Sequence, residues 1–336
     1  MSLNELWFIL VAVLFVGFFI LEGFDFGVGM STRFLARNQK ERDQLVSTIG
    51  PFWDANEVWL ITAGGAIFAA FPEWYATMFS GYYLPFVLFL LALIVRGVAF
   101  EFRHKVQTKW ISFWDWMIFA GSIIPAFVLG VLFTSLVQGM PIDASKNMYA
   151  NFGDYFNLYS IVGGIAMIII CLVHGLTFIG IRTEGPIRER AKILVSKLYL
   201  ILLAGLIVFA VLTYTMTDLF TVRPIATPLF LLRAVVTTAL GYLFSAKKKE
   251  TLAFIMTALT ILFTVTMLFV GLFPRVMISS LSPEYNLTIM NAASGPYTLK
   301  VMTIVAVVLL PFVLGYQIWS YYVFRKRISD KEPVSH

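Results

Sequence analysis

The chain has 336 residues, of which 59% are apolar and 13% are charged, and its mean hydropathy is +0.84. Soluble globular domains are about 45–50% apolar and about 25% charged, so this composition excludes a soluble globular fold. The net charge is +6, but the basic residues lie in short segments between apolar runs. This distribution argues against nucleic acid as a partner and is typical of a membrane topology signal.

Nine apolar stretches are long enough to cross a membrane, because about 20 residues at 1.5 Å rise cover a hydrocarbon core of about 30 Å. We expect an all-α polytopic membrane protein with nine transmembrane helices, arranged as two four-helix bundles plus one extra helix. Residues 1–336 then form a single transmembrane domain. A short loop at 73–78 is expected to join the second and third spans. The nine stretches are 6–30, 52–72, 79–102, 114–138, 158–180, 198–216, 225–245, 252–274 and 298–324.

The basic residues predict the orientation, since cytoplasmic loops carry an excess of Lys and Arg. Of the 25 Lys and Arg residues, 19 fall on one side, 3 on the other and 3 within or at the ends of spans. The sequence therefore predicts an external N-terminus and a cytoplasmic C-terminus. On the basic side are Arg33, Arg37, Lys40, Arg42, Arg103, Lys105, Lys109, Arg182, Arg188, Arg190, Lys192, Lys197, Lys247, Lys248, Lys249, Arg325, Lys326, Arg327 and Lys331; on the other are Lys146, Arg223 and Arg275.

Six polar residues within the spans are predicted to lie at one depth, roughly 22–29 Å from the outer face and close to the cytoplasmic interface. An ionisable group in a span costs a few kcal/mol, so it suggests a function or a partner. Crowded, poorly hydrated carboxyl groups favour the protonated form, so at least one acid should exchange a proton near neutral pH. The six are Glu22, Asp25, Asp54, Glu57, Arg96 and His174. We expect a proton pathway at Asp54, Glu57, Asp25 and Glu22.

Each of these residues also has a structural interpretation. Asp54 and Glu57, three residues apart at a helix start, could cap backbone N–H groups. Arg96 is expected to be a structural ion-pair partner for the acids rather than a substrate ligand. Glu22 and Asp25 flank glycines that permit close helix approach, so they could equally orient the bundle.

Histidine usage argues against a cofactor held by this chain. The three histidines are His104 in a basic loop, His174 in a span and His336 at the end of the sequence. A buried pair of histidines that could ligate haem is therefore absent from the sequence, and so is a Cys-x-x-Cys-His motif. We assign no catalytic residue, no metal site and no cofactor-binding residue to the chain.

Three more charged residues lie near span ends. Lys300 can extend to the external interface. Arg233 is about eight residues into its span and requires an acceptor from another helix, a partner subunit or a lipid headgroup. Asp115, between Trp114 and Trp116, is expected to be a structural carboxylate at a helix start.

Two long motifs resemble subunit II of the cytochrome bd quinol oxidases, and the similarity extends along nearly the whole chain. The motifs are Leu21-Glu22-Gly23-Phe24-Asp25-Phe26-Gly27-Val28-Gly29-Met30 and Trp53-Asp54-Ala55-Asn56-Glu57-Val58-Trp59-Leu60-Ile61-Thr62-Ala63-Gly64-Gly65-Ala66. Also matching are Arg96, Trp114-Asp115-Trp116, Gly139-Met140-Pro141, Phe273-Pro274 and Leu299-Lys300-Val301-Met302.

The resemblance implies a haem-free subunit in a bacterial cytoplasmic membrane. Its partner, subunit I, would carry two b haems and haem d, oxidise quinol and reduce oxygen to water. Asp54 matches the acid of the Trp-Asp-x-Asn motif, which implies the mouth of a cytoplasmic proton pathway between the subunits. The resemblance implies a proton-transfer role less strongly for Glu57, because glutamine, which cannot carry a proton in this way, can occupy the equivalent position in the family. A small accessory subunit and a bound lipid or quinone are left open.

Two other interpretations remain at this point. An ion-coupled secondary transporter would also bury charges in a multi-helix bundle, although an odd number of spans and no evident pair of interrupted helices argue against it. A pure scaffold, in which every buried charge serves packing, is the third interpretation.

Overall fold

The computed structural model describes residues 1–328, and this part of the chain is almost entirely helical. Within it, 8 helices are long and apolar enough to span a membrane. A ninth, α3 (Trp53–Ala70), runs beside them but begins with a polar turn. The prediction of an all-α membrane protein is confirmed, and the predicted count of nine helices approximately fits the 8 apolar spans taken together with α3. The other eight are α1 (Leu3–Phe34), α5 (Tyr83–Phe102), α6 (Thr108–Gln138), α8 (Leu158–Arg182), α9 (Pro186–Met216), α11 (Ala226–Ala246), α12 (Glu250–Leu272) and α13 (Pro296–Val323).

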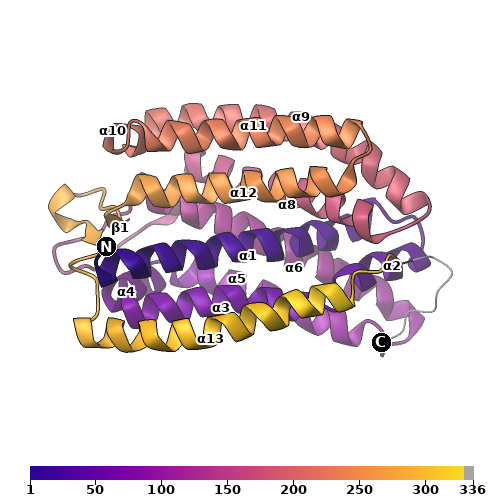
Figure 1. Cartoon of the computed structure of the whole chain (residues 1–336), viewed down its shortest axis with the longest axis horizontal. Helices are drawn as coiled ribbons and strands as arrows, with labels where there is room; N and C mark the ends of the chain where they lie inside the picture. Colours follow the sequence, from indigo (N-terminus) through magenta and orange to yellow (C-terminus); the bar gives the residue numbers. More distant parts are fainter. Residues whose placement is uncertain (329–336) are drawn as a thin grey trace.

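The helices lie side by side in two groups of four, with α13 along one face (Figure 1). The first group is α1, α3, α5 and α6, and the second is α8, α9, α11 and α12. The apolar window of α13 is 0% buried within the chain. Its first turns are attached to α1, where the Trp7 indole donates to the Leu299 carbonyl at 3.2 Å and to Thr303 at 3.1 Å.

Glycines allow the two groups to approach closely. A Cβ on Gly175 of α8 would lie 2.5 Å from the carbonyl carbon of Gly27 on α1. A Cβ on Gly130 of α6 would lie 2.5 Å from the carbonyl oxygen of Gly163 on α8. Small residues at helix crossings are the usual way for membrane helices to gain packing contacts. Helix α8 therefore joins the groups.

Several boundaries differ from the prediction, and two of them matter most for the arrangement of the helices. The expected loop at 73–78 is helical, since α4 (Pro72–Gly81) begins with a proline that suits a first helical turn. Helix α9 begins at Pro186 rather than 198 and carries its basic residues on helical turns beyond the apolar segment. The remaining elements are α2 (Gln39–Ile49), α7 (Phe152–Tyr155), α10 (Leu219–Val222), the 3₁₀ helix η1 (Pro283–Tyr285), and strands β1 (Arg275–Met277) and β2 (Leu287–Thr288), which pair antiparallel.

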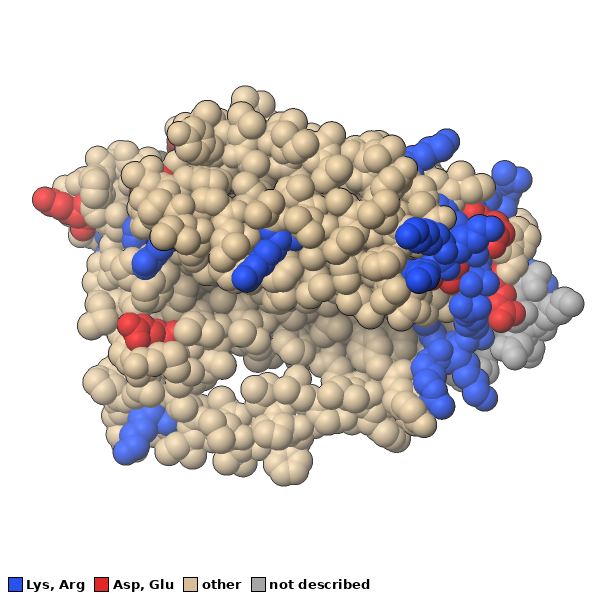
Figure 2. Space-filling view, turned by 45° about the horizontal axis from the view of Figure 1, so that its top comes forward, with Lys and Arg blue, Asp and Glu red and all other residues tan. Residues whose placement is uncertain are grey.

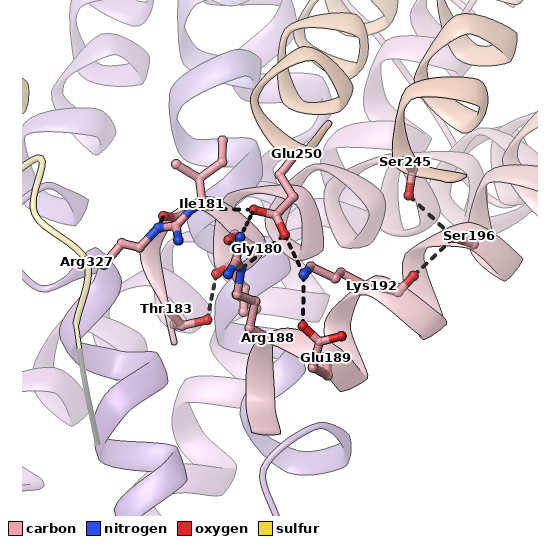
Figure 3. A network of polar contacts seen from close by, with 11 residues as sticks. Gly180, Ile181, Thr183, Arg188, Glu189, Lys192, Ser196, Ser245, Glu250 and Arg327 are labelled. Atoms are coloured by element: carbon pink, nitrogen blue, oxygen red, sulfur yellow. Dashed lines mark hydrogen bonds and ion pairs between the residues drawn. The ribbon is translucent and has the colours of Figure 1, made fainter. Parts of the chain in front are cut away.

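Charged side chains gather at one end of the molecule (Figure 2). There the Glu250 carboxylate, in the first turn of α12, accepts hydrogen bonds from Arg188 at 3.0 and 2.7 Å and lies 3.0 Å from Lys192 (Figure 3). Arg327 lies 3.6 Å from the same carboxylate. A carboxylate near a helix N-terminus is also favoured by the helix dipole. Lys331 and His336 lie outside the described residues.

The short helix α2 is tied to the same charged end. The Glu41 carboxylate accepts hydrogen bonds from the Arg190 side chain and the Arg37 backbone N–H, both at 2.6 Å. Burial by itself would raise the pKa of Glu41, but these hydrogen bonds and the nearby positive charges outweigh it and hold the pKa below its ordinary value.

Candidate functional site

A buried ion pair between α1 and α5 forms the centre of the candidate site. The side chains of Glu22 and Arg96 are both 0% exposed, and Arg96 Nη1 donates a hydrogen bond to Glu22 Oε1. The same Nη1 lies 3.1 Å from Oε1 of Glu57 on α3. The guanidinium is also held by aromatic rings, with its carbon 4.8 Å from the Phe26 centroid and 5.3 Å from that of Phe100. Arg96 thus connects three helices.

Asp25 belongs to the same site, but its carboxylate is bound by the side-chain amide of Asn56 and not by the Arg96 guanidinium. Its Oδ2 accepts a hydrogen bond of 2.7 Å from Nδ2 of Asn56, which is 0% exposed. The Asn56 Oδ1 accepts from the Tyr321 hydroxyl at 2.8 Å and from Gln317 Nε2 at 3.4 Å. Both of these donors lie on α13. The amide of Asn56 therefore joins Asp25 to the peripheral helix.

Sequence analysis missed Asn56, Gln317 and Tyr321 because amides and phenols carry no charge. The positions of these three residues in the sequence could have identified them. Asn56 stands between two acids in the second motif, and the other two are polar residues four positions apart in an apolar helix. Side chains at this spacing lie on one helix face.

The site leaves several polar atoms without a hydrogen bond to the described residues. They are Glu22 Oε2, Asp25 Oδ1, Arg96 Nε and Arg96 Nη2. Buried polar atoms are nearly always paired in folded proteins, so these atoms have capacity for further hydrogen bonds. Three carboxylates and one guanidinium would carry a net negative charge if all were ionised. The arrangement can therefore hold and exchange protons.

Asp54 lies apart from these buried acids. It is exposed and forms no hydrogen bond or ion pair within residues 1–328. The capping interpretation is not what the structure shows: the helix begins after Phe52 without a side-chain cap, and Glu57 binds Arg96. The expected ion pairs of Arg96 with the acids form with Glu22 and Glu57 but not with Asp54, whose position in the first turn directs it to the surface of the chain.

His174 is at the expected depth but does not join the acids. Its Nε2 lies 3.0 Å from the Ile20 carbonyl oxygen, and its Nδ1 lies 2.9 Å from the Thr257 hydroxyl of α12. The ring stacks on Phe254 with centroids 4.4 Å apart. A carbonyl can only accept, so Nε2 carries a hydrogen. His174 therefore links α1, α8 and α12 and takes no part in the acidic site.

A second buried ion cluster was not foreseen. Arg103, placed by the sequence in a cytoplasmic loop, is 2% exposed, and its Nε donates to Asp115 Oδ1 at 2.6 Å. Its Nη2 donates to Asp43 of α2 at 2.5 Å. The expectation that Asp115 stands at a helix start is wrong, because α6 begins at Thr108. Proximity in the fold, not sequence spacing, creates these pairs.

The sequence matches the family model described as cytochrome bd terminal oxidase subunit II over residues 3–324, which is most of the chain and includes every residue of the site. The chain belongs to the cytochrome bd terminal oxidase subunit II family. The resemblance noted in the two motifs is confirmed.

Individual relatives agree with this assignment. The chain is 59% identical to cytochrome bd ubiquinol oxidase subunit 2 of Bacillus subtilis, over 100% of this chain and 99% of that protein. It is 38% identical to cytochrome bd-I ubiquinol oxidase subunit 2 of Escherichia coli K12, over 98% and 96% respectively. The fold is similar to a chain of the bd oxidase from Geobacillus thermodenitrificans, with a TM-score of 0.77, 16% identity, and coverage of 97% and 100%.

The family determines the class of the protein. It is a subunit of a respiratory oxidoreductase complex in a bacterial membrane, and it is not a secondary transporter. Membership as subunit II implies a partner subunit I, and a cytochrome complex implies haem.

Proposed function

We propose that the chain is the haem-free subunit of a cytochrome bd quinol oxidase and that it contributes to proton uptake from the cytoplasm. Subunit I then carries two b haems and haem d, oxidises quinol and reduces oxygen. The single transmembrane domain of this chain supports subunit I. The observation that carries the proton proposal is that Glu22 and Glu57 both contact Arg96, while Asp25, bound by Asn56, is buried one turn from Glu22.

The path begins at Asp54 and continues to the buried acids. Asp54 is the exposed member, and Glu57 follows it by one helical turn with a side chain that is 18% exposed. Glu57 and Glu22 contact the same Nη1 of Arg96, so a proton that reaches one is close to the other. Carboxylates in such a series are suitable proton carriers. Arg96 holds the carboxylates of Glu22 and Glu57 close together.

The histidines of this chain are poorly suited to haem. A ligand nitrogen must be free to bind iron, whereas both ring nitrogens of His174 are within hydrogen-bond distance of protein oxygens. His104 lies exposed at the surface just after α5. These contacts support haem binding by the partner alone.

The proposed orientation places the basic end in the cytoplasm. Figure 2 shows that Lys and Arg gather at the end where α12 begins, which is the expected distribution for cytoplasmic loops. Helix α1 starts at the opposite end, and α13 finishes at the basic end (Figure 1). The N-terminus is then external and the C-terminus cytoplasmic.

Replacing Asp54 tests the proton path. In the purified two-subunit complex, Asp54→Asn should leave assembly and haem content normal and reduce quinol oxidation by about tenfold or more, since it removes one proton carrier. Steady-state oxygen consumption and the visible haem spectrum are measured together. Glu101→Gln is the matched control, because Glu101 is also an exposed acid and its carboxylate lies 3.6 Å from Lys105, away from Arg96.

The outcomes separate the proposals. Reduced turnover for Asp54→Asn with normal haem, and unchanged turnover for Glu101→Gln, support the proton path. Unchanged turnover for both variants leaves this chain only a scaffold role. A haem spectrum from this chain purified without subunit I would contradict the haem-free assignment.

A further inference from the structure

Arg233 is an unpaired cation on the membrane-facing surface of α11. It is the eighth residue of a helix that begins at Ala226, so its Cα lies about 10 Å from that end of the helix. Its side chain is exposed and has no carboxylate within ion-pair distance among residues 1–328. Figure 2 shows that the surface between the charged ends is nearly uncharged, with isolated cations on it.

Aromatic rings hold the Arg233 side chain in place. Its guanidinium carbon lies 5.4 Å from the Phe230 centroid and 5.8 Å from that of Phe263 on α12. Phe230 precedes Arg233 by nearly one turn, so the guanidinium points toward the N-terminal end of α11. A charged group in a span costs a few kcal/mol unless an anion or water reaches it. The charge is thus directed toward one membrane interface.

An apolar groove opens on the same end of the molecule. It has a volume of about 660 Å³ and lies between α1 and α12. Its walls include Ile9 and Val13 of α1, which are 48% and 53% exposed, and Leu262 of α12. From Glu5 to Val16 the groove follows α1 for about 16 Å, a length suited to an acyl chain.

The mouth of the groove has an excess of positive charge. Arg223 lines it, donates to the Phe273 carbonyl at 3.0 Å and has no ion pair within the described chain. Glu5 is the acid at the mouth, and its carboxylate already accepts the Ser2 N–H at 2.8 Å. Arg233 stands seven residues further along α11 than Ala226, which also lines the groove, and its positive charge is likewise complementary to a phosphate.

We propose that Arg233 and Arg223 form a binding site for an anionic phospholipid. The phosphate binds to the guanidinium groups at the N-terminal end of α11, and one acyl chain lies in the groove between α1 and α12. Guanidinium groups suit this role because they bind phosphate oxygens through two parallel hydrogen bonds. With the proposed orientation, the lipid belongs to the outer leaflet.

Lipid binding to the assembled complex tests this site. The complex is purified in mild detergent, delipidated and titrated with phosphatidylglycerol, and the bound lipid is counted by native mass spectrometry. Arg233→Leu should weaken binding of phosphatidylglycerol about tenfold, the factor expected for loss of one charge-assisted hydrogen bond. Arg233→Lys should weaken it less. Lys300→Leu is the control, because Lys300 is also an exposed cation near a helix start.

Each outcome decides the proposal. A selective loss in Arg233→Leu, with phosphatidylcholine binding more weakly than phosphatidylglycerol, supports it. Equal binding by wild type and Arg233→Leu overturns it, and so does equal binding of the two lipids. Displacement of the lipid by inorganic phosphate alone would indicate a site for free phosphate. A subunit I carboxylate found on Arg233 in the complex would replace the lipid. The haem spectrum checks that every variant is assembled.

Discussion

The two four-helix groups have the same architecture but differ in the polar side chains that they bury. The first group buries Glu22, Asp25 and Arg96. The second buries mainly neutral groups, for example Thr260, which lies 3.0 Å from Thr237 and 3.1 Å from Thr238, and its buried cation Arg182 lies at the very end of α8. Neutral hydroxyl pairs satisfy each other at little cost in a membrane, whereas buried charges are expensive. The comparison indicates that packing alone does not require the charges, and the first group is where we propose the proton path.

The largest effect is expected from removing the central cation. Arg96→Leu leaves Glu22 and Glu57 without their counter-charge, which should destabilise the complex by about 3–5 kcal/mol. Thermal unfolding of the purified complex and its yield measure the effect. Thr260→Val, in the neutral group, should cost about 1 kcal/mol or less.

Arg96→Lys retains the positive charge beside Glu22 and Glu57, so it can be measured even if Arg96→Leu fails to assemble. It should recover part of the lost stability. Equal losses for Arg96→Leu and Thr260→Val would remove the distinction between the two groups.

A smaller loss of stability is expected from a substitution at the contact between α1 and α8, where the two groups meet. Gly27→Ala places a Cβ against the carbonyl of Cys171 on α8, where backbone atoms cannot move easily, and should cost about 1–3 kcal/mol. Gly64→Ala on α3 is the control, since no atom lies within 4 Å of its added Cβ. That change should be neutral or slightly stabilising. Equal melting temperatures for the two variants would show that α8 does not hold the groups together.

The smallest loss of stability is expected from breaking the ion pair between Glu41 and Arg190, which lies outside the membrane. The pKa of Glu41 is lowered in the folded chain, so its stabilising contribution is present above the unfolded pKa of about 4.3 and is lost as the pH falls through the folded pKa. Arg190→Gln should remove a few tenths of a kcal/mol at neutral pH and flatten this dependence, because the pair is partly hydrated. Melting temperatures between about pH 3 and pH 7 measure it. An unchanged profile would mean that Arg190 contributes nothing.

The fold was largely predictable, because span length and hydropathy are local properties of the sequence. Helix α4 was missed because its residues are neither apolar enough for a span nor rich in turn formers. The site was predictable in part. Glu22, Glu57 and Arg96 meet as their depths suggested, but depth does not determine which way a side chain points. For this reason Asp54 and His174 lie elsewhere, and Asn56 and Tyr321 complete the site.

The most direct test of the proton path is proton uptake by the complex carrying Asp25→Asn. Asparagine preserves the shape of the side chain beside Asn56 but cannot carry a proton. The reconstituted oxidase is started with quinol, and a pH-sensitive dye on the cytoplasmic side records uptake while the visible spectrum records haem content. We expect normal haem content and proton uptake slowed by about tenfold or more. Uptake at the wild-type rate in a fully assembled complex would contradict a proton route through the buried acids of this chain.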